Sequence, residues 1–193
     1  NNFSCLYNFL KEFPFKSVNI IVMADNVSDE TKEKLEKESS GLDIHYTSIG
    51  SSAGTFHNVF MDSLNLDDDT IVYFLENDYI HAPNSMNALF DGFDIGAHYV
   101  TLYDHPDKYI SSYDYGEPTR VLKGNVCHWK MTISTTMTFA AKVSTLTEDK
   151  DIWIENTGGS YPTDHKAFTQ LREKGRTLIS PIPGYSTHGE TAW

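Results

Sequence analysis

The sequence predicts an α/β fold in which helices flank both faces of a mostly parallel central sheet, and three observations support it. Helical and strand-like patterns alternate along the chain. Two runs, residues 18–24 and 70–75, are continuously apolar, as strands buried on both faces usually are. The 193 residues, 39% of them hydrophobic, are enough for a domain with its own core. We expect a single domain over residues 1–193 and leave open that it is a fragment of a longer protein.

Turn residues mark the ends of the expected helices. Pro14 stops the first helical pattern, Gly41 suits the end of the second, and Gly175 suits the end of the last. In order, we expect a helix over residues 3–13, a strand over 18–24, a helix over 28–40, a strand over 42–49, a helix after a loop at 50–54, strands over 70–75, 99–103 and 136–143, a helix over 163–174 and a strand over 176–180. The segment 104–124, rich in Tyr, Asp and Pro, is expected to be irregular.

The composition argues against several classes of partner. A net charge of -12 disfavours nucleic acid and anionic lipid surfaces, because both attract clustered Lys and Arg. The same charge is compatible with a bound divalent cation, although solubility explains it equally well. Cys5 and Cys127 lack the spacing of a disulfide framework or a zinc site, so we expect free thiols in a reducing compartment, the cytoplasm. No apolar run approaches the roughly 20 residues of a membrane span, so we expect no membrane insertion.

An acidic segment follows the apolar run 70–75. Glu76 and Asp78 are two positions apart, so in extended geometry their side chains point to the same face. Open α/β sheets bind ligands beyond the carboxyl ends of their strands, and two carboxylates there suit Mg²⁺ or Mn²⁺. The alternative is that Asn77 and Asp78 simply begin a surface turn.

Two segments of the first half could face a ligand. Gly50 and Gly54 would let the backbone approach a ligand closely, and the helix after them offers N–H groups to a phosphate. Asp25 ends the run 18–24, where its carboxylate could accept hydrogen bonds from a base or a sugar. With Asn26, it equally suits a cap for the next helix.

Two residues of the second half are candidates for chemistry. Asp164 lies at the start of the helix over 163–174, where the helix dipole favours the ionised carboxylate that a general base requires. The alternative is an ordinary N-terminal helix acid. His188 lies in a polar C-terminal loop; imidazole binds Mn²⁺, although a lone loop histidine is usually only solvated.

Three segments together resemble the GT-A class of nucleotide-sugar glycosyltransferases. They are residues 20–31 (IIVMADNVSDET), 50–58 (GSSAGTFHN) and 74–78 (FLEND). The corresponding parts of that class are a strand ending in an acidic turn, a Gly-containing loop with an Arg-Asn pair, and a strand ending in a D-x-D-type motif. Order and spacing agree over the first half of the chain. The whole chain is also similar to the capsid-glycosylating transferase domains of large chlorella viruses.

The resemblance implies a GT-A-like, Rossmann-type domain with a donor half at residues 1–80 and an acceptor and catalytic half at 81–193. It implies transfer of a sugar from a nucleotide-diphosphate donor, UDP-linked as is common in the class, to a hydroxyl of a glycan or glycoprotein. For a viral protein the compartment would be the host cytoplasm. Asp164 would be the base, which implies inversion at the anomeric carbon. The implied metal ligands for Mn²⁺ or Mg²⁺ are Asp78, Glu76 and His188.

Residues of the donor half would contact the nucleotide. The residues implied by the resemblance are Asp25, Asn26, Gly50, Gly54, His57, Asn58 and Asn77. Asp25 would face the base or the ribose. His57 and Asn58 match the Arg-Asn pair of the class, but His lacks the permanent charge and the bidentate fork of Arg. A histidine packed on its helix is an equal alternative for His57.

Two departures from the class matter, and two other functions stay open. Glu76 stands where the class has Asp, which makes Asp78 the firmer ligand, and the first strand of the class would precede residue 3. A nucleotidyltransferase is one alternative, although we find no Gly-rich basic loop of that kind. A non-catalytic carbohydrate-binding domain is the other, against which Asp78, Asp164 and His188 argue.

Aromatic side chains could offer flat apolar faces to sugar rings. The candidates are Trp129, Trp153, Tyr109, Tyr113 and Tyr115. Because 13% of the residues are aromatic, we expect most of these side chains in the core instead.

Overall fold

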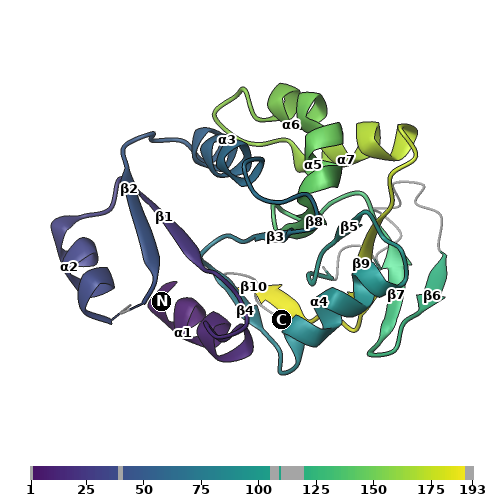
Figure 1. Ribbon diagram of the computed structural model, residues 1–193, viewed down its shortest axis with the longest axis horizontal. Helices are drawn as coiled ribbons and strands as arrows, with labels where there is room; N and C mark the ends of the chain where they lie inside the picture. The colour runs from purple at the N-terminus through teal and green to yellow at the C-terminus, as the bar shows by residue number, and fades with distance from the viewer. Residues whose placement is uncertain (1, 39–40, 105–108, 110–119, 190–193) are drawn as a thin grey trace.

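The computed structural model describes residues 2–38, 41–104, 109 and 120–189 (Figure 1). Its helices are α1 (Asn2–Glu12), α2 (Asp29–Glu38), α3 (Ser52–Ser63), α4 (Ser85–Asp94), α5 (Val143–Glu148), α6 (Lys150–Asn156) and α7 (Asp164–Glu173). Its strands are β1 (Ile21–Asp25), β2 (Asp43–Thr47), β3 (Ile71–Phe74), β4 (Tyr79–His81), β5 (Tyr99–Val100), β6 (Val121–Lys123), β7 (His128–Met131), β8 (Phe139–Lys142), β9 (Leu178–Ile182) and β10 (Ser186–His188). The predicted α/β class is confirmed. Within this described part, no helix is both long and apolar enough to cross a membrane.

The strands form one large sheet and two small ones. The large sheet has six strands in the order β3-β8-β5-β9-β7-β6. In it only β5 and β9 pair in parallel, whereas the other neighbouring strands pair antiparallel. The small sheets pair β1 with β2 in parallel and β4 with β10 antiparallel.

The expectation of a mostly parallel central sheet is therefore wrong. β8 lies between β3 and β5 and runs antiparallel to both. β6 and β7 form a hairpin, whose turn is closed by a 2.9 Å hydrogen bond from Gly124 N to Cys127 O. A continuous apolar run indicates a strand buried on both faces, and here helices bury antiparallel strands in that way too. An apolar run such as residues 70–75 therefore does not determine whether the strand pairs in parallel or antiparallel.

Helices cover both faces of the six-stranded sheet (Figure 1). On one face, Phe60 of α3, Trp153 of α6 and Phe168 of α7 belong to one buried cluster. On the other face, Leu89 of α4 packs with Trp129 of β7 in a second cluster. The core of the protein thus lies above and below this sheet.

The tryptophans considered for sugar stacking belong to this core. Trp129 is 0% and Trp153 1% exposed, so neither offers a face to a ligand. Tyr109 is 60% exposed, whereas Tyr113 and Tyr115 lie outside the described residues.

The sheet of β1 and β2 is covered less well. Ile21 at the start of β1 is 58% exposed, and Ala24 is the one fully buried residue of these two strands. An open groove of about 640 Å³ lies between these strands and α3, with Met23, Asn58 and Met61 among its lining residues. The part of the predicted donor half that contains β1 and β2 is therefore less tightly packed than the six-stranded sheet.

Several elements lie where no helix or strand was predicted, namely β4, α4, β6, β7, α5, α6 and β10. In α4, polar residues and a glycine interrupt the apolar spacing that would predict a helix. A Cβ on Gly92 would come within 2.7 Å of Val100 Cγ1, so the helix needs glycine to approach the sheet. Asp91 is buried and accepts hydrogen bonds from Trp129 Nε1 (3.0 Å) and Asn125 N (2.7 Å). Asp91 and Gly92 are thus explained by contacts with residues distant in sequence, which the local sequence does not reveal.

Candidate metal centre

The acidic segment lies between β3 and β4, and β10 brings the C-terminal histidine to it. β3 ends at Phe74, and the chain turns through Glu76, Asn77 and Asp78 before β4 begins. β10 pairs with β4 so that His188 is opposite Tyr79, next to Asp78 along the chain. The expectation that His188 lies in a loop is therefore wrong, because its backbone forms a sheet with β4.

Gly189 closes this contact tightly. Its N–H donates to Asp78 O at 2.6 Å, and a Cβ at this position would lie 2.7 Å from the same oxygen. Only glycine lets the two backbones come so close. Next to this contact, the Tyr79 ring is 1% exposed and packs edge-on against the His188 ring, with centroids 5.3 Å apart. The Tyr79 ring thus packs against one side of the imidazole.

Glu76, Asp78 and His188 offer ligand atoms that all lie within 4.8 Å of one another. His188 Nε2 is 2.9 Å from Asp78 Oδ2, with the two side chains 22% and 23% exposed. Asp78 Oδ1 is buried and has no hydrogen-bond partner among the described residues, a costly state for a carboxylate oxygen. Two carboxylates and an imidazole form a donor set that Mn²⁺ accepts, and a cation there would satisfy Asp78 Oδ1. The residues therefore fit a divalent metal ion.

The electrostatics of Glu76 show how negative charge accumulates at this cluster. Burial raises the pKa of Glu76 above its ordinary value, the charge of Asp78 raises it further, and His188 opposes the shift. The negative charge of Asp164 raises the pKa of Glu76 further, so Asp164 is close enough to Glu76 for the two carboxylates to interact electrostatically. A bound cation would relieve the repulsion between these carboxylates.

Asp164, the first residue of α7, holds a turn between β7 and β8. Its Oδ2 accepts from the backbone N–H groups of Thr135 and Thr136, both at 2.8 Å. The hydroxyls of Ser134 and Thr135 lie 3.4 Å from the same oxygen. Thr136 and Met137 both have positive φ (51° and 58°), an uncommon backbone for such residues that these bonds help to maintain. All four of these bonds end on Oδ2 of Asp164.

Asp25 braces the loop from β2 to α3. It accepts from Ile49 N (2.6 Å), Gly50 N (2.8 Å) and Thr47 Oγ1 (2.9 Å). These bonds, with that of Ile49 the largest cause, lower the pKa of Asp25. Asn26 has φ 49°, and its Nδ2 lies 3.3 Å from where a Cβ of Gly50 would be. In this conformation Asp25 is a structural anchor, and its contact with a nucleotide stays a prediction.

Gly54 does not lie in the predicted loop, which is a correction. It falls in the first turn of α3, where a Cβ would be 2.6 Å from Ile49 Cγ2, so packing explains the glycine. Gly50 lies in the loop as expected, with φ +78°. The side chain of Ser51 caps α3 by accepting from Gly54 N. The N–H of Gly54 is therefore already used within the protein.

The other nucleotide-binding candidates lie in three different surroundings. His57 Nδ1 is 3.2 Å from Thr157 Oγ1, which links α3 to the loop after α6. Asn58 is exposed and borders the groove next to β1 and β2. Asn77 is exposed on the turn between the two metal-ligand candidates. None of these three has a contact that fixes a role in binding.

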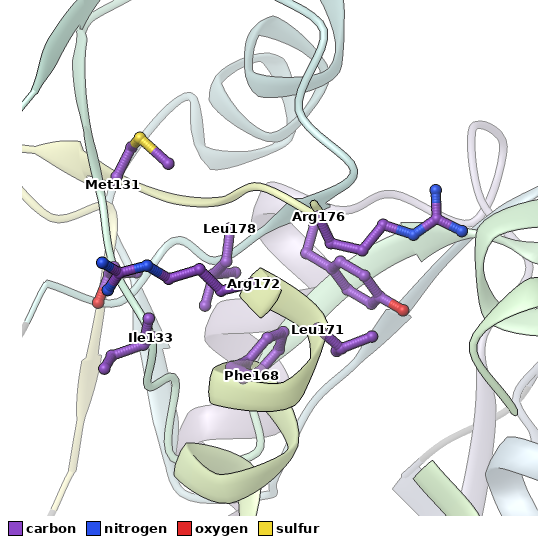
Figure 2. Close-up of a pocket in the computed structure, with 9 residues that line it drawn as sticks. Met131, Ile133, Phe168, Leu171, Arg172, Arg176 and Leu178 are labelled. Carbon is purple, nitrogen blue, oxygen red and sulfur yellow. The ribbon is translucent and has the colours of Figure 1, made fainter. Parts of the chain in front are cut away.

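A small cavity under α7 plays no part in this site. Figure 2 shows it among Met131, Ile133, Phe168, Leu171 and Arg172, which are mostly core side chains. Its volume of about 10 Å³ is room for one water molecule at most. It is a packing gap and not a substrate pocket.

The residues that position the candidate side chains could not be predicted from the sequence. Tyr79 was visible beside the acidic segment, but only its pairing with His188 shows its packing role. Thr135 and Thr136, the backbone partners of Asp164, lie about 28 positions away in sequence, so no local signal marks them. Comparison with known proteins adds nothing further, since no protein-family model matches the chain and no curated protein matches it significantly.

Proposed function

We propose that the protein is a metal-dependent glycosyltransferase of the GT-A class. It would move a sugar from a nucleotide-diphosphate sugar, UDP-linked, to a hydroxyl of a glycan or glycoprotein. The observation that carries the proposal is the approach of Glu76, Asp78 and His188 within 4.8 Å, with Asp78 Oδ1 buried and unpartnered. The predicted base, Asp164, acts electrostatically on the same cluster.

The position of the cluster supports the proposal further. Glu76 and Asp78 follow the carboxyl end of β3, and Asp25 is the last residue of β1. Strand ends of this kind are where open α/β sheets bind their ligands. The two acidic turns belong to the three segments by which the sequence resembles the GT-A class, and the third segment is attached to the first by the hydrogen bond from Gly50 N to Asp25.

Each candidate residue has a defined task in sugar transfer. Asp78 and His188 would hold the cation, with Glu76 as third ligand. When bound, the cation acts as Lewis acid on the diphosphate and stabilises the leaving group. Asp164 Oδ1 would take the proton of the acceptor hydroxyl as the acceptor oxygen bonds to the anomeric carbon. The bond from that carbon to the diphosphate breaks with its electron pair going to the nucleotide. Because the acceptor oxygen attacks the opposite face of the carbon in this single displacement, configuration inverts.

Calorimetry of UDP binding with and without Mn²⁺ tests the proposal. We expect affinity for UDP to rise about tenfold or more with Mn²⁺, a gain of roughly 1.4 kcal/mol. Equal affinity in the two titrations would refute the proposed function. Binding of UDP and Mn²⁺ with no release of UDP from any UDP-sugar would point instead to a non-catalytic domain.

The variant Asp164→Asn tests whether Asp164 is the general base. Its amide oxygen can still accept the bonds from Thr135 and Thr136, whereas its ability to take a proton is lost. We expect turnover of a UDP-sugar to fall about 10²- to 10⁴-fold while UDP and Mn²⁺ bind nearly as before. A fully active variant would rule out Asp164 as the base.

A further inference from the structure

Tyr79 connects the candidate metal cluster to the buried interior of the protein. It begins β4 directly after Asp78, and it is 1% exposed. Its ring packs edge-on against two other rings, those of His188 and Tyr103, each with centroids 5.3 Å from its own. Edge-to-face contacts of this kind are favourable, and a ring packed this closely keeps one orientation. The Tyr79 ring therefore limits the positions open to the imidazole of His188.

The hydroxyl of Tyr79 reaches the turn between β7 and β8. It donates to Thr136 O at 3.5 Å, a long hydrogen bond. Burial raises the pKa of Tyr79, and hydrogen bonding with the side chains of Thr138 and Thr136 opposes that shift. The charge of Glu76 raises the same pKa further, so the hydroxyl and the Glu76 carboxylate interact electrostatically. One phenol thus interacts with the turn and with two of the three candidate metal ligands.

The backbone of Thr136 is bonded on both sides. Its N–H donates to Asp164 Oδ2 at 2.8 Å, and its carbonyl accepts from the Tyr79 hydroxyl. Its φ of 51° is strained for a β-branched residue and persists only where the surroundings fix it. Because the Thr136 side chain is exposed, its own packing contributes little to fixing this backbone. A continuous series of contacts therefore leads from Asp164 through Thr136 and Tyr79 to His188.

We propose that Tyr79 is a positioning residue that acts on both halves of the site. Its ring orients His188 for the metal ion, and its hydroxyl holds the turn to which the proposed base Asp164 is bonded. This role rests on the proposed glycosyltransferase function. Sugar transfer requires the leaving diphosphate on the metal and the acceptor hydroxyl at the base to lie in line with one carbon atom, so the spacing of metal and base has to be fixed.

The role of the ring is tested by titration with Mn²⁺. Tyr79→Leu removes the ring, whereas Tyr79→Phe keeps it and removes only the hydroxyl. The full chain, with UDP present, is titrated with Mn²⁺, and the paramagnetic resonance signal of the free ion is followed. We expect Tyr79→Leu to weaken Mn²⁺ binding about tenfold, as loss of a residue that orients a metal ligand commonly does. Tyr79→Phe should bind Mn²⁺ nearly as the wild type does.

The role of the hydroxyl is tested by amide hydrogen exchange, measured by NMR. In Tyr79→Phe, the amides of Thr135 and Thr136 should exchange about two- to tenfold faster, which corresponds to the loss of one hydrogen bond. The amides of β8 should exchange as in the wild type. Tyr99→Phe is the matched control, because it also removes a buried hydroxyl, one that donates to Asp149 Oδ2 at 2.9 Å. It should leave exchange at Thr135 and Thr136 unchanged.

The outcomes separate this role from the function on which it rests. If Tyr79→Leu binds Mn²⁺ as tightly as the wild type, or if Tyr79→Phe leaves exchange at Thr135 and Thr136 unchanged, the positioning role is refuted and the transferase proposal stands. Faster exchange throughout the sheet would indicate a general loss of stability and would refute the role as well. If circular dichroism shows that Tyr79→Leu does not fold, Tyr79→Phe decides alone. A wild type that binds no Mn²⁺ in the presence of UDP refutes the transferase proposal, and the positioning role with it.

Discussion

The six-stranded sheet and the β1–β2 sheet differ sharply in packing. In β8, the residues Phe139, Ala140 and Ala141 are all 0% exposed, and helices cover both faces of the sheet. In β1, by contrast, Ile21 is 58% exposed, and the groove next to α3 is open. Burial of apolar area is the main source of stability, so the six-stranded sheet should carry most of the free energy of unfolding.

The residues of the proposed site are divided between these two sheets. Glu76 and Asp78 follow a strand of the well-packed sheet, and Asp164 begins a helix that packs on it. Asp25 and the loop at Gly50 belong to the loosely packed sheet. Groups that do chemistry need fixed positions, whereas ligand-binding segments often come from the less stable parts of a protein. The candidate metal ligands Glu76 and Asp78 and the proposed base Asp164 are therefore attached to the well-packed sheet, whereas Asp25 and Gly50 are attached to the loosely packed one.

The largest expected effect is in the core of the six-stranded sheet. Phe139 is 0% exposed, and its ring stacks on that of Trp153 with centroids 4.6 Å apart. Phe139→Ala should lower the free energy of unfolding by about 3–5 kcal/mol, because it removes buried area and leaves a cavity. Urea unfolding followed by circular dichroism measures this. A loss below about 1 kcal/mol would show that the sheet is not the stable core.

A pH effect of somewhat smaller size is expected at β4, between the two regions. His81 is 2% exposed, its Nε2 lies 3.0 Å from the Tyr73 hydroxyl, and its Nδ1 is buried without a described partner. Burial lowers the pKa of His81 from 6.5 to about 4 in the folded protein. The folded state therefore favours neutral His81, and this stability is fully present above pH 6.5 and is lost as the pH falls toward 4. The gap corresponds to roughly 3 kcal/mol.

Comparison with His81→Gln isolates this contribution from that of the carboxylates. Urea unfolding of both proteins between pH 7 and pH 4 should show the wild type losing about 3 kcal/mol more than the variant. Parallel loss in the two proteins would mean that protonated His81 is tolerated where it lies, and that burial at this junction is weaker than we infer.

The smallest effect is expected in the β1–β2 sheet. Ile21→Ala should lower the free energy of unfolding by less than about 1 kcal/mol, because over half of the side chain is already exposed. The same urea measurement, set beside that of Phe139→Ala, gives the contrast between the two sheets. Similar losses for the two variants would remove the distinction on which the comparison rests.

Much of the fold could be predicted because turn residues and apolar runs act locally. Helix α1 ends just before Pro14, and Gly41 and Gly175 have the positive φ expected after helices. Strand direction could not be predicted, because burial by helices gives parallel and antiparallel strands the same apolar pattern. Helix α4 could not be predicted, because the buried polar Asp91 and the helical Gly92 are explained only by contacts with residues distant in sequence.

The candidate site, too, could be predicted from the sequence only in part. The spacing of Glu76 and Asp78 predicts a shared face, and the structure brings their carboxylates together with His188 as a metal site requires. Ion binding itself stays a prediction. The pairing of β10 with β4 that positions His188 depends on contacts more than 100 residues apart, which no local pattern contains. Gly54 shows the opposite error, since its role is to pack against Ile49 and not to approach a ligand.

Titration with Mn²⁺, followed by the paramagnetic resonance signal of the free ion, tests the central claim most directly. We expect the full chain to bind one Mn²⁺ in the presence of UDP, and Asp78→Ala to weaken this binding at least about tenfold. Asp94→Ala, which removes an exposed carboxylate of α4, should bind Mn²⁺ as the wild type does. If the wild type leaves Mn²⁺ free, or if Asp78→Ala binds Mn²⁺ as well as Asp94→Ala does, Glu76, Asp78 and His188 do not form a metal site.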